Sequence, residues 1–134
     1  MDNLYITGTK CTLEVNFDAG TGTLEIAGES YPENIYDFFQ PLYKWIEEYL
    51  KDPDKSMVLN LKITYLNSTS TRCVLDFLTF LEDYRKNGRN IRVNWFYEED
   101  DDILETAEFM NSNLDLPINI TPLPEEAKRR DRSL

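Results

Sequence analysis

The sequence contains no histidine. Histidine is the side chain that most often serves as a general base, and it is a usual ligand of zinc. Its absence excludes nucleophilic catalysis by Ser/His or Cys/His pairs. The two cysteines, Cys11 and Cys73, have no C-x-x-C spacing and indicate neither a disulfide framework nor a zinc ribbon. We therefore expect two small core thiols in a protein that uses no metal or other cofactor, and many classes of enzyme are excluded.

Long apolar runs and an excess of positive charge are also missing. No stretch approaches the roughly 18 apolar residues of a membrane span, and the N-terminus lacks the basic and apolar regions of a signal peptide. Lys and Arg total 14 against 25 Asp and Glu, which gives a formal charge of −11. Such a charge repels phosphate backbones and anionic lipids. The sequence thus predicts a cytoplasmic protein with no nucleic-acid partner and no direct membrane binding.

The composition that remains is that of one globular domain. The 134 residues are 41% hydrophobic and 13% aromatic, which is enough for a single core. We expect this domain to span residues 1–124. Residues 125–134 follow Pro122 and Pro124 and are mostly charged, which predicts a flexible C-terminal tail.

The hydrophobic periodicity changes several times along the chain. Alternation with period two predicts strands, and apolar residues three or four apart predict amphipathic helices. These patterns predict strands near residues 4–7, 12–17, 24–26, 57–66, 91–97 and 118–121, and helices near residues 35–50, 70–86 and 103–114. Pro41 lies inside the first helix and predicts either a kink or a helix start there. Asn87 and Gly88 predict the end of the second helix.

The strands alternate instead of being continuously apolar, which is typical of a sheet with one open face. We therefore predict an α/β domain of two layers, in which helices pack on one face of a mixed β-sheet. In the strand at residues 57–66, Tyr65 is expected on the covered side together with Leu59, Leu61 and Ile63. The open face is expected to carry polar side chains: Thr12, Glu14, Asn16, Glu25, Asn60, Lys62, Arg92 and Asn94.

Three acidic or glycine-rich features could carry chemistry but have simpler interpretations. Gly20-Thr21-Gly22 is not followed by a helix, so it predicts a hairpin turn rather than a dinucleotide-binding loop. The acidic run from Glu98 to Asp102 lacks the spacing and the glycine of an EF-hand, and it fits the N-terminus of the third helix. The remaining carboxylates are interpreted as the solvated face of the first helix: Glu33, Asp37, Glu47 and Glu48.

A different cluster lies between the strand at residues 57–66 and the second helix. Residues 65–72 read Tyr-Leu-Asn-Ser-Thr-Ser-Thr-Arg, with four consecutive hydroxyl residues. One polar residue is needed there to cap the helix. Another could display its hydroxyl at the carboxyl edge of the sheet, where helix amides accommodate a phosphate. Capping and phosphorylation both stay open on spacing alone.

Three segments carry a resemblance when they are taken together. They are Ser30-Tyr31-Pro32-Glu33-Asn34, Tyr65-Leu66-Asn67-Ser68-Thr69-Ser70, and Val93-Asn94-Trp95-Phe96-Tyr97 followed by the acidic run. In this combination the chain resembles the SiaC family of bacterial regulatory phosphoproteins over residues 4–121. The resemblance implies a fold like the STAS domain of anti-sigma factor antagonists, which is a mixed sheet backed by helices.

The resemblance also implies a regulatory switch in biofilm and c-di-GMP signalling that is not itself an enzyme. Family members are phosphorylated in the second segment by a dedicated Ser/Thr kinase and dephosphorylated by a PP2C-type phosphatase. The unphosphorylated form binds and activates a diguanylate cyclase. By motif position the phosphoacceptor is Ser68, with Thr69 as the alternative, although the commoner pattern has Thr at this position and Ser at the next. The implied partner-binding residues are Tyr65, Asn67, Ser68, Thr69, Ser70 and Arg72.

Three other functions stay open on the sequence alone. A STAS-type anti-sigma factor antagonist in a partner-switching pathway would use the same switch with another partner. An enzyme built on carboxylates and a metal is disfavoured, because histidine and an ordered spacing of ligands are both missing. A constitutive scaffold protein would carry no phosphate, so intact mass would distinguish it from a switch.

Overall fold

The computed structural model describes residues 1–31, 35–98 and 102–123. Its elements in chain order are β1 (Leu4–Ile6), β2 (Glu14–Phe17), β3 (Thr23–Ser30), α1 (Ile35–Tyr49), β4 (Met57–Leu66), α2 (Ser68–Lys86), β5 (Ile91–Tyr97), α3 (Ile103–Ser112) and β6 (Ile118–Pro122). This order agrees with the one predicted from periodicity. The predicted tail at residues 125–134 and residues 99–101 of the acidic run lie outside the described residues.

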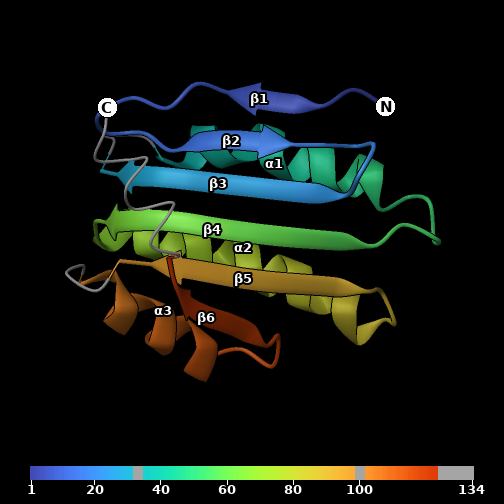
Figure 1. Ribbon diagram of the computed structural model, residues 1–134. Coiled ribbons are helices and arrows are strands. Elements are labelled where there is room, and N and C mark those ends of the chain that lie inside the picture. Colours follow the sequence, from blue (N-terminus) through green and yellow to red (C-terminus); the bar gives the residue numbers. More distant parts are fainter. Residues whose placement is uncertain (32–34, 99–101, 124–134) are drawn as a thin grey trace.

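The strands form one mixed sheet, in which they lie side by side in chain order (Figure 1). The pairs β1–β2 and β2–β3 are antiparallel, and every later pair is parallel. Crossovers between parallel strands are right-handed, so three successive crossovers in one direction place their helices on the same face. Figure 1 shows α1 and α2 behind the sheet. The predicted two-layer α/β architecture is confirmed.

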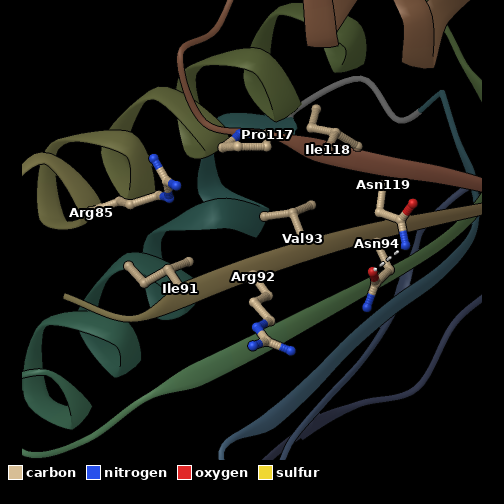
Figure 2. A pocket seen from close by; sticks show the side chains of 8 residues that line it. All are labelled: Arg85, Ile91, Arg92, Val93, Asn94, Pro117, Ile118 and Asn119. Atoms are coloured by element: carbon tan, nitrogen blue, oxygen red, sulfur yellow. Dashed lines mark hydrogen bonds between the residues drawn. The ribbon is translucent and has the colours of Figure 1, made fainter.

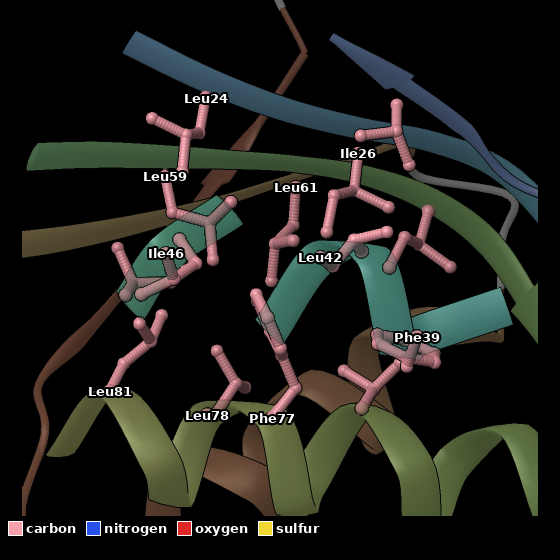
Figure 3. Close-up of a cluster of buried hydrophobic side chains, with 14 of the residues drawn as sticks. Leu24, Ile26, Phe39, Leu42, Ile46, Leu59, Leu61, Phe77, Leu78 and Leu81 are labelled. Carbon is pink, nitrogen blue, oxygen red and sulfur yellow. The ribbon is translucent and has the colours of Figure 1, made fainter. Parts of the chain in front are cut away.

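The core fills the space between the sheet and the helices. Leu59 and Leu61 of β4 point from the sheet toward Leu42 of α1 and toward Phe77 and Leu78 of α2 (Figure 3). These five side chains have at most 1% of their surface exposed. Burial of each such side chain contributes about 1.5–3 kcal/mol, which makes this layer the main source of stability.

The opposite face of the sheet is polar and carries no helix of the described chain. Lys62 forms an ion pair with Glu25 at 2.8 Å, and both side chains are accessible. Asn94 donates a hydrogen bond to Asn60 at 3.0 Å, which leaves both asparagines only half-exposed. The predicted open face is therefore present, with its asparagines partly shielded by one another.

Tyr65 is where the predicted alternation was wrong. Its side chain is 50% exposed, whereas it was expected on the covered side with Leu59, Leu61 and Ile63. The register between β3 and β4 shifts, because Gly28 pairs with Ile63 while the next residue, Glu29, pairs with Tyr65. β4 therefore has one extra residue at this point, and a bulge of this kind reverses the alternation beyond it.

Smaller differences concern element ends and the thiols. Helix α2 begins at Ser68, two residues earlier than predicted, and α3 ends two residues before Leu114. Helix α1 continues through Pro41. Cys73 is buried as expected, but Cys11 is only half-buried. Within the described ranges, no helix combines the length and the apolar character needed to cross a bilayer.

Candidate functional site

The hydroxyl cluster lies where β4 ends and α2 begins. Asn67 is the N-cap of α2, with extended backbone angles of φ −73° and ψ 175°. Its side-chain Oδ1 accepts a hydrogen bond of 2.8 Å from the backbone N–H of Ser70. Its own backbone N–H donates to the carbonyl of Ser30 at 3.0 Å, which ties the helix start to the end of β3. Capping is thus performed by asparagine, and the hydroxyls are not needed for it.

The structure separates the four hydroxyl side chains into two pairs. Ser70 is fully buried, and its Oγ lies 2.9 Å from the equally buried Oγ of Ser30. Thr71 is half-buried and donates its hydroxyl to the carbonyl of Asn67 at 2.9 Å. Ser68 and Thr69 are exposed, and neither hydroxyl bonds to any described residue. Of the four hydroxyls in this cluster, only those of Ser68 and Thr69 are therefore available to a modifying enzyme.

The electrostatic surroundings of Ser68 and Thr69 suit an added anion. The first turn of α2 contains no acidic residue, and the positive end of the helix dipole lies there. Arg72 lies four residues after Ser68 and therefore on the same side of the helix. Its guanidinium Nε is 3.2 Å from a carboxylate oxygen of Asp76, and both side chains are exposed. A phosphate on Ser68 would meet free helix amides and a guanidinium within reach.

The thiol near this site is not a reactive group. Burial raises the pKa of the Cys73 thiol above its ordinary value, and the nearby Asp76 carboxylate raises that pKa further. A thiol with a raised pKa stays protonated at neutral pH and is a poor nucleophile. The chemistry of this region therefore rests on its exposed hydroxyls.

Two exposed tyrosines lie beside the hydroxyl pair. Tyr31 follows the last residue of β3, and Tyr65 is the residue displaced outward by the bulge in β4. Their rings meet edge to face, with centroids 5.8 Å apart, and the side chains are 44% and 50% exposed. Exposed aromatic side chains of this kind are enriched in protein interfaces.

We call this region the acceptor edge and define it by Tyr31, Tyr65, Asn67, Ser68, Thr69 and Arg72. Five of these residues were expected from the sequence to bind partners. Ser70, the sixth expected residue, is buried against Ser30 and is not accessible to a partner. Tyr31 was not among the expected partner-binding residues, although it belongs to the first of the three segments that carry the family resemblance.

Two further features of the sequence, the glycine-rich turn and the acidic run, were considered above as possible ligand sites. Gly22 ends the turn between β2 and β3 with φ +75°, as expected for a hairpin glycine. No group of three or more His, Cys, Asp or Glu side chains within residues 1–31, 35–98 and 102–123 could hold a metal ion. The acidic run is described only at Glu98 and Asp102, and Asp102 makes no side-chain capping bond to α3.

Comparison with known families gives one match across most of the chain. Residues 6–123 match the model of the SiaC family regulatory phosphoprotein. An uncharacterized protein of Pseudomonas aeruginosa strain UCBPP-PA14 is 33% identical over 121 residues, which cover 90% of this chain and 96% of that protein.

Solved structures give the same match in three dimensions. The crystal structure of apo-SiaC from Pseudomonas aeruginosa superposes with a TM-score of 0.84 at 33% identity, covering 90% of this chain and 99% of that chain. The crystal structure of the diguanylate cyclase SiaD in complex with its activator SiaC, also from Pseudomonas aeruginosa, matches with a TM-score of 0.83 at 32% identity. That match covers 90% of this chain and 99% of the solved one.

Proposed function

The chain belongs to the SiaC family of regulatory phosphoproteins, and from this premise we propose that it activates a diguanylate cyclase under the control of phosphorylation at Ser68. The protein is a regulator and not an enzyme, in agreement with the function that the resemblance to the family implied. A partner Ser/Thr kinase would add the phosphate, and a PP2C-type phosphatase would remove it. The unphosphorylated form would be the active one.

The observation that carries the proposal is the separation of hydroxyls at the N-terminus of α2. Ser68 and Thr69 are exposed and unbonded, whereas the next two hydroxyls are engaged in internal hydrogen bonds. Ser68 is favoured over Thr69 because it directly follows the Asn67 cap, as in the family motif, and has Arg72 at the fourth position after it. Thr69 is the alternative acceptor.

The acceptor edge also supports a role in partner binding. Aromatic side chains and arginine are the residues that most often dominate the energy of an interface, and this edge presents Tyr31, Tyr65 and Arg72 around Ser68. A partner seated on the tyrosine pair would cover the acceptor hydroxyl. Phosphate at Ser68 would then lie inside the interface and would have to be desolvated on binding.

The choice of effector rests on the relative. The SiaC protein that shares 32% of its sequence with this chain is described as the activator of the cyclase SiaD in their complex. We propose a cyclase of the same class as the effector here. An anti-sigma factor is the alternative partner, and no feature of the described residues favours it.

The test combines intact mass with cyclase activity. The protein, co-expressed with the proposed partner kinase, is expected to gain the mass of one phosphate and to stop stimulating c-di-GMP synthesis by the proposed effector cyclase. Treatment with the phosphatase should restore both the mass and the stimulation.

Two variants make this test specific. Ser68→Ala should stay unphosphorylated and stimulate the cyclase constitutively, whereas the matched Thr69→Ala should behave as the wild type does. Phosphorylation of Ser68→Ala but not of Thr69→Ala would move the acceptor to Thr69. Stimulation that is unaffected by stoichiometric phosphate would contradict the switch itself.

A further inference from the structure

A hollow of about 430 Å³ lies at the end of the sheet opposite the acceptor edge (Figure 2). It exists because β5 begins at Ile91, whereas its pairing with β6 begins only at Val93. The first two residues of β5 therefore have no strand on that side. Pro117, directly before β6, borders the hollow across this gap.

The charge of the hollow is opposite to that of the chain. Arg85 from the last turn of α2 and Arg92 from β5 both line it, and no carboxylate does. Each of the four other surface hollows identified on the described chain includes at least one Asp or Glu side chain. In a protein with a formal charge of −11, a hollow whose only charged lining residues are two arginines is an exception.

Both arginines are also without a partner among the described residues. Four other cations, Lys51, Lys62, Arg72 and Lys86, each lie within 3.4 Å of a carboxylate oxygen. Arg85 and Arg92 are exposed and make neither an ion pair nor a hydrogen bond to the described chain. The ordinary role of Arg85 is to interact with the negative end of the α2 dipole.

That explanation does not extend to Arg92. It lies on a strand, and its directly paired neighbour on β4 is the apolar Val58. Lys62 occupies the same open face and is neutralised by Glu25 at 2.8 Å. Arg92 thus differs from the other strand cation of this face, because it forms no ion pair with a carboxylate of the described residues.

Neutral donors border the same hollow. Asn94 and Asn119 both line it, and Asn119 donates a hydrogen bond of 3.3 Å to the side-chain oxygen of Asn94. Asn94 in turn donates to Asn60 at 3.0 Å, so the two amides beside the arginines are held in place by a ladder across three strands. Figure 2 shows the amides on the side of β5 that also carries Arg92, with Arg85 across the strand.

We propose that this hollow binds an oxyanion, namely the carboxylate or phosphate group of a small ligand. Guanidinium groups match the geometry of both anions, and the fixed asparagine amides add directional donors. The volume lies in the range of small-ligand sites. The proposal is independent of the acceptor edge, because the hollow lies at the amino end of β5 and Ser68 follows the carboxyl end of β4.

The test is a titration of the whole chain followed by amide proton–nitrogen NMR at low ionic strength. Pyrophosphate serves as the phosphate probe and succinate as the carboxylate probe. We expect saturable shifts confined to the amides of residues 85, 91–94, 118 and 119. Arg92→Gln should weaken binding by about tenfold or more, as expected for the loss of a charge-assisted hydrogen bond. Lys44→Gln, which removes the same charge from an exposed position on α1, should leave the affinity unchanged.

Each outcome decides the proposal. Saturation by pyrophosphate alone assigns a phosphate ligand, and saturation by succinate alone assigns a carboxylate ligand. Absence of saturable shifts with both probes overturns the site. Equal weakening by Arg92→Gln and Lys44→Gln would also overturn it, because the effect would then reflect net charge only. Because Arg92 is exposed, Arg92→Gln should remain folded, and the dispersed amide signals of its spectrum verify this in the same experiment.

Discussion

The four hydroxyl residues that follow Asn67 have different roles because the backbone places each one differently. The first two positions of α2 face solvent, and the next two turn toward β3 and toward the helix start. Ser30 and Ser70 form a buried pair that satisfies both hydroxyls where no water reaches them. A run of similar side chains thus contains a structural pair and an accessible pair.

This division predicts that two serine substitutions differ in their effect on stability. Ser70→Ala leaves the buried Ser30 hydroxyl without a partner, which should lower the free energy of unfolding by about 1–3 kcal/mol. Ser68→Ala removes an exposed, unbonded hydroxyl and should change it by less than about 0.5 kcal/mol. Urea unfolding of both variants measures the difference. Equal midpoints would show that the buried pair contributes nothing.

Gly22 is a second residue whose role follows from its backbone. Its φ is +75°, and a Cβ there would lie 2.6 Å from the carbonyl oxygen of Ser56 and 2.5 Å from the hydroxyl of Tyr49. We expect the strained φ alone to make Gly22→Ala less stable than the wild type by about 1–3 kcal/mol. The close contacts of the new Cβ with Ser56 and Tyr49 should add to this loss. Gly20→Ala in the same turn meets only the Asp18 side chain at 3.3 Å and is the matched control. Similar thermal midpoints of the two variants would contradict this account.

Among the elements, α2 is fastened to the segment before β6 by one carboxylate. Glu82 is 9% exposed, and its Oε2 accepts hydrogen bonds from the backbone N–H groups of Asp115 at 2.6 Å and Leu116 at 3.2 Å. Lys86 lies 3.3 Å from its other oxygen. Burial acts to raise the pKa of Glu82, but these two N–H groups and Lys86 outweigh it and lower the pKa below its ordinary value.

The lowered pKa of Glu82 predicts a pH-dependent contribution to stability. A carboxyl whose pKa is lower in the folded state stabilises the fold fully above its unfolded pKa of about 4.3. This contribution is lost as the pH falls through the lowered folded pKa of Glu82. We therefore expect Glu82→Gln to be less stable than the wild type at pH 7, with a difference that shrinks below the unfolded pKa. Urea midpoints of both proteins across this range test it, and a constant difference would contradict it.

Periodicity predicted the helices and strands well, but it did not predict local irregularities such as the bulge in β4. Alternation in β4 indicates a strand with one solvent-exposed face. It cannot show that β4 has one extra residue, between Ile63 and Tyr65, opposite the consecutive residues Gly28 and Glu29 of β3. The exposure of Tyr65 depends on that bulge and so on a long-range pairing. The hydroxyl run marked the correct region, whereas the burial of Ser70 depends on Ser30, which is 40 residues away in the sequence.

On the scale of the whole molecule, the two proposed sites occupy opposite ends of one continuous sheet. The acceptor edge follows the carboxyl ends of β3 and β4, and the arginine-lined hollow lies at the amino end of β5. Parallel strands hold these ends apart by the length of the sheet, so both sites could be occupied at once. The chain already carries a formal charge of −11, so an added phosphate would strengthen its electrostatic repulsion of any acidic partner.

We expect phosphorylation to change partner binding and to leave the fold intact. A phosphate adds about −1.5 to −2 charge, and at the N-terminus of α2 it meets the positive end of the dipole and no acidic side chain in the first turn. The thermal midpoint of the phosphorylated protein should therefore lie within a few degrees of the unmodified one. A partner covering the acceptor edge must instead desolvate a dianion, and a penalty of about 3 kcal/mol weakens binding roughly a hundredfold.

Calorimetry with the effector, together with a thermal melt, measures both quantities for the quantitatively phosphorylated protein. Ser68→Asp should weaken binding less than phosphate does, because its side chain carries one charge and two oxygens. Thr79→Asp adds the same charge to α2 eleven residues further along, about 16 Å from Ser68, and should leave effector affinity unchanged.

If the phosphorylated and unmodified proteins are both folded and bind the effector equally well, the acceptor edge is not the switched surface. If Thr79→Asp weakens binding as much as Ser68→Asp does, net charge controls the interaction in place of a covered phosphate.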